Sequence, residues 1–179
     1  MKMKNYAYKI DAHDRTISLS PDWVNFAEAN QASVLSRTVL GSSLWSHLHG
    51  PEIALIFETL LRRVRHENRT LAFPFRCDSP GKRRYMQMVM RPLVDHAVEF
   101  VSTLLREEPR DEVALLNPAT QRDDRFIVMC AWCKKVKTPE WVEVEEAIIR
   151  LRLFAQPFLP HITHGVCPSC KHTILNQDD

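Results

Sequence analysis

The sequence predicts an α+β protein in which one antiparallel sheet carries helices on one face and a small cysteine-rich module follows. Stretches of strand-like composition lie at both ends of the first 107 residues, with helical patterns between them. Two Cys-x-x-Cys pairs, at Cys130 and Cys133 and at Cys167 and Cys170, follow in the last third of the chain. The 179 residues suffice for one ordinary domain and one small module, but not for two full-sized domains.

Two short strands and a helix are predicted near the start of the chain. Tyr6–Ile10 and Thr16–Leu19 have strand-like composition and flank the polar turn 11–14. Ser20, followed by Pro21, then offers a helix cap with proline just inside the first turn. We therefore expect a helix over residues 21–30.

A longer amphipathic helix is predicted to begin at Pro51. Its apolar side chains recur at a spacing of about 3.6 residues, which places them on one face of the helix. These side chains are Ile53, Ile56, Phe57, Leu60, Leu61 and Val64.

A hairpin and a further strand complete this region. Leu71–Cys77 and Tyr85–Leu93 are predicted strands, and residues 78–81 between them place Pro80 and Gly81 at the two centres of a type II turn. Val98–Glu107 is apolar on both faces in its middle. We therefore expect this last strand at the centre of the sheet.

Short stretches of sequence and the order of the elements connect residues from about Tyr6 to Glu107 to a known family. The stretches are Ser20-Pro-Asp-Trp-Val-Asn-Phe26, Asn30 and Val39-Leu-Gly-Ser-Ser-Leu-Trp45. In these features the region resembles a PAS (Per-ARNT-Sim) sensor domain. The resemblance implies a sensory role. Some PAS domains hold haem, flavin or a metabolite between sheet and helices, and others hold nothing and act as dimer or relay modules, so the ligand of this chain stays open.

Several side chains in the PAS-like region are candidates for ligand contacts but have simpler explanations. The candidates for a haem ligand are His47, His49 and His66. Solvated histidines at helix ends are the favoured interpretation of all three. The methionines of the 85–93 strand, Met86, Met88 and Met90, would line a pocket if one exists, but methionine is more often a core filler. No cofactor-binding residue is assigned in this region.

The segment after residue 107 is predicted to be a linker. It contains Pro109, an Asn117-Pro118 step and mixed charge, with room for one short helix. The predicted organisation is therefore a PAS-like sensory domain over 1–107, a linker over 108–125 and a four-cysteine module over 126–179.

The two Cys-x-x-Cys pairs are the strongest chemical pattern in the sequence. Each such turn brings two sulfurs toward one cation, and four thiolates at about 2.3 Å close a tetrahedral zinc site without an open position. A site of this kind is structural, so we expect a zinc-knuckle module. The predicted Zn²⁺ ligands are Cys130, Cys133, Cys167 and Cys170. Redox-active pairs, or cysteines that only pack, are the alternatives that the spacing leaves open.

The cysteine-rich segment also resembles a tail found at the end of some bacterial response regulators and sensors. The stretches that carry this resemblance are Cys130-Ala-Trp-Cys-Lys-Lys135, Trp141-Val-Glu-Val144 and Thr163-His-Gly-Val-Cys-Pro-Ser-Cys170. Cations flank both pairs, which suits the net negative charge of four thiolates around one divalent ion. These cations are Lys134, Lys135, Lys137, Lys171 and His172.

Two further residues bear on the metal prediction. His164 lies three residues before Cys167 and would either replace a cysteine as ligand or hydrogen-bond to a sulfur, and the second role is favoured. Cys77 has no partner nearby in the sequence. It is interpreted as a small packing residue at a strand end.

The absence of several sequence motifs narrows the classes of function that the sequence predicts. The longest apolar run, 126–133, is far shorter than the roughly 20 residues of a membrane-spanning helix, and no signal peptide is readable, so a cytoplasmic location is expected. Nucleophile elbows, phosphate loops and metal sites with an open position are not found, so no enzymatic activity is predicted. The arginines of 62–69 and the basic residues 82–84 lack interleaved aromatic residues, which favours a solvated face over nucleic-acid contacts.

Three hypotheses for function follow. The first is a cytoplasmic, bacterial-type sensory or adaptor protein, with homodimerisation as one possible form, whose PAS-like domain relays its state through the zinc module to a signalling partner. The second is a thiol redox sensor in which oxidation expels zinc and unfolds residues 126–175. The third is a nucleic-acid-binding regulator that uses the zinc module and the 62–69 face, with salt-sensitive binding as its signature.

Overall fold

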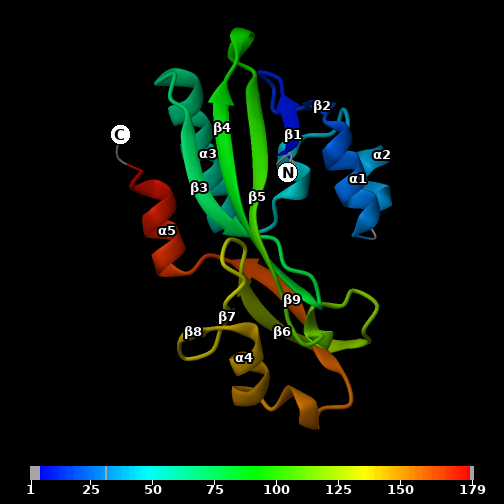
Figure 1. Cartoon of the computed structure of the whole chain (residues 1–179). Coiled ribbons are helices and arrows are strands. Elements are labelled where there is room, and N and C mark those ends of the chain that lie inside the picture. Colours follow the sequence, from blue (N-terminus) through cyan, green and yellow to red (C-terminus); the bar gives the residue numbers. More distant parts are fainter. Residues whose placement is uncertain (1–4, 31, 178–179) are drawn as a thin grey trace.

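The computed structural model of the chain describes residues 5–30 and 32–177 (Figure 1). The helices are α1 (Pro21–Ala29), α2 (Ser33–Thr38), α3 (Pro51–His66), α4 (Val144–Arg150) and α5 (Pro168–Leu175). The strands are β1 (Asn5–Ile10), β2 (Thr16–Leu19), β3 (Leu71–Arg76), β4 (Lys82–Pro92), β5 (Val98–Pro109), β6 (Arg122–Cys130), β7 (Val136–Lys137), β8 (Trp141–Val142) and β9 (Leu159–Gly165). Within these described residues, no helix is long and apolar enough to cross a membrane.

The first sheet has five antiparallel strands in the order β2-β1-β5-β4-β3. The predicted central position of the 98–107 strand is confirmed, because β5 lies between β1 and β4. The β4–β5 pair runs from Lys82 opposite Pro109 to Pro92 opposite Val98. This long ladder extends beyond the rest of the sheet and carries the chain toward the second sheet (Figure 1).

The helices of the first region begin where the sequence predicts. The Ser20 hydroxyl accepts a hydrogen bond from the backbone N–H of Trp23, which caps α1, and Pro21 occupies the first turn. Helix α3 begins at Pro51 and buries five of the six predicted apolar side chains: Ile53, Ile56, Leu60, Leu61 and Val64. The α+β prediction is confirmed.

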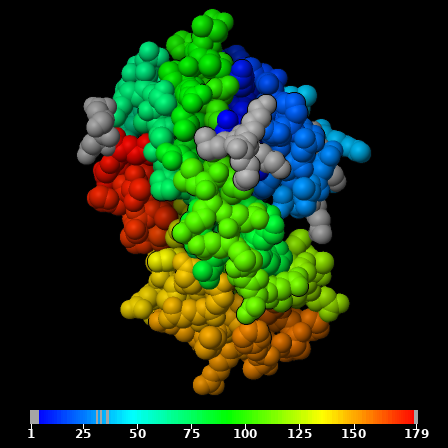
Figure 2. Space-filling view, viewed as in Figure 1, coloured from blue at the N-terminus to red at the C-terminus, as the bar shows by residue number. Residues whose placement is uncertain are grey.

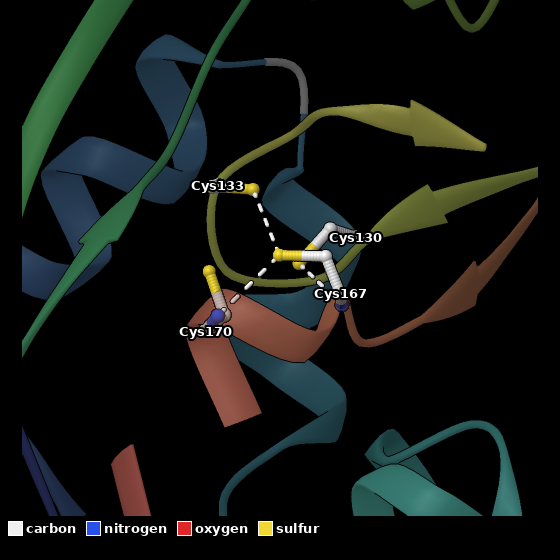
Figure 3. Close-up of side chains that lie close together, drawn as sticks. All are labelled: Cys130, Cys133, Cys167 and Cys170. Carbon is white, nitrogen blue, oxygen red and sulfur yellow. Dashed lines mark hydrogen bonds between the residues drawn. The ribbon is translucent and has the colours of Figure 1, made fainter. Parts of the chain in front are cut away.

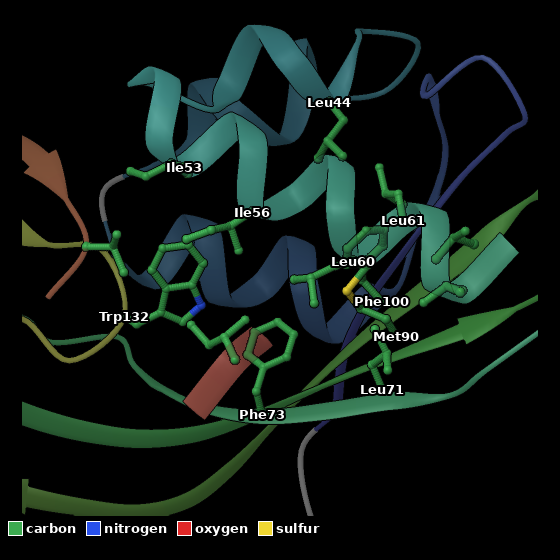
Figure 4. Packing of buried hydrophobic residues seen from close by; sticks show 14 of the residues in the cluster. Leu44, Ile53, Ile56, Leu60, Leu61, Leu71, Phe73, Met90, Phe100 and Trp132 are labelled. Carbon is green, nitrogen blue, oxygen red and sulfur yellow. The ribbon is translucent and has the colours of Figure 1, made fainter. Parts of the chain in front are cut away.

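The core of the first region lies between α3 and the sheet (Figure 4). Leu60 on the helix and Met90 and Phe100 on the strands are 0% exposed. Burial of each such side chain contributes about 1.5–3 kcal/mol, so this layer stabilises the contact of the sheet with α3. The interpretation of Met90 as a core residue agrees with this packing.

The second sheet has four strands in the order β8-β7-β6-β9, and β6 and β9 run parallel. Helix α4 covers it with Val144, Ala147 and Ile148, which are buried. Val113 and Leu115, from the segment predicted to be a linker, are also buried in this second core. The segment after β5 is therefore packed onto the second sheet by its own apolar side chains.

The two regions share apolar packing. Trp132, from the turn after β6, and Ile174, from α5, belong to the same buried cluster as α3 and the first sheet. Figure 4 shows the Trp132 indole beside Ile56 and Phe73. Figure 2 shows the yellow and orange residues of the second sheet against the green strands, and the red α5 alongside, as one continuous body.

Candidate metal centre

The four cysteines of the two Cys-x-x-Cys pairs lie together at the junction of β6, β9 and α5 (Figure 3). Their sulfur atoms are all within 4.8 Å of one another. The Sγ atoms of Cys133 and Cys167 are 3.7 Å apart. Neighbouring sulfurs of a tetrahedral site with bonds of about 2.3 Å lie about 3.8 Å apart. The four cysteines are therefore positioned to hold a metal ion.

The first knuckle is a tight turn that follows β6. The backbone N–H of Lys134 donates to the carbonyl of Cys130 at 3.1 Å, and the N–H of Cys130 donates to the carbonyl of Lys135 at 2.7 Å. Lys134 adopts the left-handed conformation, with φ of 63°. These two backbone bonds fix the turn that carries Cys130 and Cys133.

The second knuckle is the start of α5. Cys167 is the N-cap residue, and its sulfur accepts the backbone N–H of Cys170 at 3.4 Å. The backbone N–H of Cys167 donates in turn to the sulfur of Cys130 at 3.4 Å. Amide donors and the positive end of a helix dipole both favour thiolate over thiol.

The sulfurs are electrostatically coupled. Hydrogen bonds from the Cys133 and Cys170 side chains, with smaller contributions from backbone N–H groups, hold the pKa of Cys130 well below its usual range. The same pairing with Cys130 raises the pKa of Cys133 to about 12, and it raises the pKa of Cys170 as well. Without a metal, one thiolate is therefore stabilised by hydrogen bonds from neighbouring thiols that keep their protons. A divalent cation would instead compensate the charge of several thiolates at once.

The other predicted site residues lie outside this cluster. His164 is on β9, and the cluster found among the described residues consists of the four cysteines without it. Burial raises the pKa of the Cys77 thiol, which suits the packing role that was predicted for it. Lys171 forms an ion pair with Glu52 of α3 at 3.1 Å, and the Lys134 ammonium donates to the carbonyl of Ala131 at 2.7 Å.

The arginines predicted to form a solvated face make contacts within the chain. Arg63 donates to the carbonyl of Leu175 at 2.6 Å. Arg65 forms an ion pair with Asp14 at 2.7 Å. The basic residues of the hairpin pair with carboxylates as follows: Lys82 and Arg84 with Glu107, and Arg83 with Glu145. Much of this positive charge is therefore compensated within the fold.

An ion-pair network between the two sheets has no counterpart in the sequence prediction. Asp78, whose side chain is 1% exposed, pairs with Arg76 and with Arg110. The Arg76 guanidinium also lies 2.7 Å from the carboxylate of Glu143, the N-cap residue of α4. Burial opposes the charge of Arg76, but its bonds to these two carboxylates outweigh burial and raise its pKa. Only the folded chain brings residues 76 and 143 together.

The position of Trp132 is a further feature that the sequence prediction missed. Its side chain is 4% exposed and stacks on Phe57 of α3, with ring centroids 6.1 Å apart. The available signal was its place between Cys130 and Cys133, in an apolar run that does not reveal which surface the ring contacts.

Comparison with known proteins agrees with this architecture. A family model described as the PAS fold matches residues 18–107, which is just over half of the chain. The matched range runs from β2 to β5 and includes α3 and most of the first core. Among proteins with curated descriptions, none matches this sequence. By the extent of the family match and by its antiparallel sheet with packed helices, the chain belongs to the PAS-fold family.

Proposed function

We propose that the chain is a cytoplasmic sensory or adaptor protein without enzymatic activity. In this proposal the PAS domain relays its state through a C-terminal module, stabilised by structural Zn²⁺, to a signalling protein. Zn²⁺ is the metal that four closely spaced thiolates suit best, because they complete its tetrahedral coordination. The predicted ligands are Cys130, Cys133, Cys167 and Cys170.

The packing of Trp132 is the observation that carries the relay. This residue lies between two proposed metal ligands, and its side chain is buried in the core of the PAS domain. Formation of the knuckle orders the backbone on both sides of the indole. A change in the packing of α3 would therefore alter the geometry of the metal centre, and loss of the metal would alter the packing of α3.

Polar contacts also connect the PAS domain to the C-terminal module. The backbone N–H of Arg76, at the end of β3, donates to the carbonyl of Trp132 at 2.6 Å. The Arg76 side chain donates a hydrogen bond to the carboxylate of Glu143 at the start of α4. One residue of the PAS sheet thus contacts both the cysteine knuckle and the helix of the second sheet.

Exposed apolar side chains on the C-terminal module support a contact with a partner. Ile149 is 70% exposed and Phe154 is 84% exposed. Both border a groove of about 630 Å³ between α4 and the segment after β5. Contiguous exposed apolar surface is typical of protein interaction sites. We assign the contact with apolar side chains of the signalling partner to this groove.

Metal content and local stability test the proposal together. Elemental analysis of protein purified with reductant and without added metal is expected to give one zinc per chain. Cys133→Ser and Cys167→Ser are expected to lose it, while Cys77→Ser, the matched control, keeps it. Hydrogen exchange after zinc removal should then show faster exchange in residues 126–175 and also in α3 and β3. Full zinc content in Cys167→Ser would overturn the metal centre, and unchanged exchange in α3 and β3 would overturn the relay.

A thiol redox sensor is a second candidate that one observation favours. Cys133 and Cys170 are partly exposed, unlike Cys130 and Cys167, and both border a cavity of about 300 Å³. A peroxide would oxidise two thiolates to a disulfide while it is itself reduced to water, and the remaining thiolates would release Zn²⁺. Zinc release at one equivalent of hydrogen peroxide, reversed by thiol reductant, supports this candidate. Retention of zinc under excess peroxide rejects it.

A further inference from the structure

The groove between α4 and the segment after β5 has an apolar floor. Val113 and Leu115, from that segment, are 5% and 0% exposed, and Ile148 of α4 lies with them among the lining residues. Ile149 and Phe154 also line the groove and expose most of their side chains. The volume of about 630 Å³ is as large as that of sites that enclose whole small molecules, so several side chains of a partner fit.

The walls of the groove favour a helix over a strand as the bound segment. A bound strand needs a row of free backbone groups at the edge of a sheet. The walls instead come from α4, from the turn at 153–155 and from residues 110–115, and among the described lining residues only Leu159 belongs to a strand. The backbone N–H of Val113 already donates to the carbonyl of Pro80. An amphipathic helix, by contrast, binds such a groove through the apolar side chains of one face.

Uncompensated negative charge borders the groove. Asp111 and Glu112 line it and are exposed, and neither forms an ion pair or a side-chain hydrogen bond with any described residue. Glu145 is already paired with Arg83 at 2.7 Å and with Arg110 at 3.4 Å. The Arg110 side chain is 6% exposed, so this cation contributes little to the surface of the groove. A partner with positive charge beside its apolar side chains is complementary to this surface.

We propose that this groove binds an amphipathic helix of the signalling partner. The apolar stripe of that helix packs against Ile149 and Phe154, and Lys or Arg residues beside the stripe face Asp111 and Glu112. The inference rests on the proposed function and deepens it, because it gives the partner a shape and a charge. Burial of the stripe supplies the affinity. The two carboxylates select a basic helix over an acidic one and raise the association rate.

Peptide selection tests this class of partner before the partner is identified. A phage-displayed library of random peptides of about 16 residues, somewhat over four helical turns, would be depleted on Phe154→Ser protein and then selected on the zinc-loaded full chain. The enriched peptides are expected to carry apolar residues at helical spacing and at least a threefold excess of Lys and Arg over Asp and Glu. A neutral or acidic enriched set, or no enrichment at all, overturns the proposal.

Charge variants test the role of the two carboxylates. Asp111→Asn combined with Glu112→Gln is expected to weaken binding of an enriched peptide at least tenfold at low salt, measured by fluorescence anisotropy, and to flatten the fall of affinity with salt. Asp124→Asn combined with Glu28→Gln removes the same two kinds of charge from exposed positions outside the groove and should leave binding as in the parent. Equal binding by the two double variants overturns the proposal.

Two further measurements separate this inference from the alternatives. A dimer in sedimentation that Phe154→Ser converts to a monomer would assign the groove to a second copy of the chain and overturn the proposal. Zinc content, and hydrogen exchange in α3 after zinc removal, are measured on the same protein. If both agree with the relay and no basic helix is selected, only this class of partner is rejected. If a basic helix is selected and exchange in α3 ignores zinc, the relay is rejected and the groove stands.

Discussion

The indole of Trp132 stacks on the ring of Phe57, with centroids 6.1 Å apart and an angle of 28° between the ring planes. Phe57 lies on α3 of the PAS domain, and Trp132 lies between two cysteines of the proposed metal centre. The same indole lines two cavities, one beside Phe57 and Phe75 and one beside Cys133 and Cys170. This single contact therefore joins the core of the PAS domain to the proposed metal centre.

Removal of the indole should destabilise the whole chain. Trp132→Ala deletes a side chain that is 4% exposed, and truncation of a buried tryptophan costs about 3–5 kcal/mol. The free energy of unfolding from urea denaturation, followed by circular dichroism, measures this cost. Ile149→Ala, at a position that is 70% exposed, is the control and is expected to change stability by less than about 0.5 kcal/mol. Equal effects of the two variants would contradict the central role of Trp132.

The buried carboxylate of Asp78 should be essential for stability. Asp78→Asn keeps the shape of the side chain but leaves the guanidinium groups of Arg76 and Arg110, 9% and 6% exposed, without their shared anion. Breaking a buried ion pair costs about 3–5 kcal/mol. Glu146→Gln removes one partner of an exposed pair with Arg150 and is expected to cost at most about 0.5 kcal/mol. Thermal unfolding of both variants checks the contrast, and an Asp78→Asn protein as stable as Glu146→Gln would refute it.

A close contact between β6 and β9 should make Gly165 intolerant of a side chain. A Cβ atom at this position would lie 2.9 Å from Cγ1 of Val128. Overpacking of this kind costs about 1–3 kcal/mol, and we expect Gly165→Ala to weaken zinc retention against a chelator because Cys167 lies two residues away. Val128→Ala in the same chain removes the clashing methyl groups and should restore most of the loss. A double mutant no more stable than Gly165→Ala would contradict this explanation.

Acid should weaken the fold through carboxylates that are bound in the native state. A hydrogen bond from Lys82, supported by Arg84, holds the pKa of Glu107 below its ordinary value of 4.5. Backbone N–H groups of Arg15 and His13 lower the pKa of Asp11 in the same way. Because the folded-state pKa values are the lower ones, the stabilisation is present above about pH 4.5 and is lost as the pH falls through them.

The free energy of unfolding, measured between pH 6 and pH 3, should therefore decline with acid, and Glu107→Gln should make that decline shallower. Glu112→Gln, at an exposed position after β5, is the control and should leave the slope as in the parent. A slope that is identical in Glu107→Gln and the parent would count against the Lys82–Glu107 contact as its source.

Local patterns determined much of this protein. The Ser20-Pro21 cap, the apolar spacing of 53–64 and the break at 78–81 predicted α1, α3 and the β3–β4 hairpin, because each is decided by neighbours within a few residues. The predicted type II turn was wrong, because Gly81 does not adopt the positive φ that this turn requires at its second central residue. The two-faced apolar character of 98–107 predicted a central strand, and β5 is central. The Cys-x-x-Cys spacing predicted four converging sulfurs, and they converge.

Tertiary structure alone decided what surrounds those elements. The parallel pairing of β6 with β9 and the burial of Trp132 against Phe57 join segments that are far apart in the sequence. The Arg76–Glu143 ion pair does the same across 67 positions. An apolar run in the sequence predicts that a residue is buried, but it does not predict which surface the residue packs against. A charged residue in the sequence likewise does not indicate its ion-pair partner. The cavity of about 330 Å³ beside Trp132 likewise has lining residues from both parts of the chain, Phe57 and Met88 from one and Trp132 from the other, which no local pattern specifies.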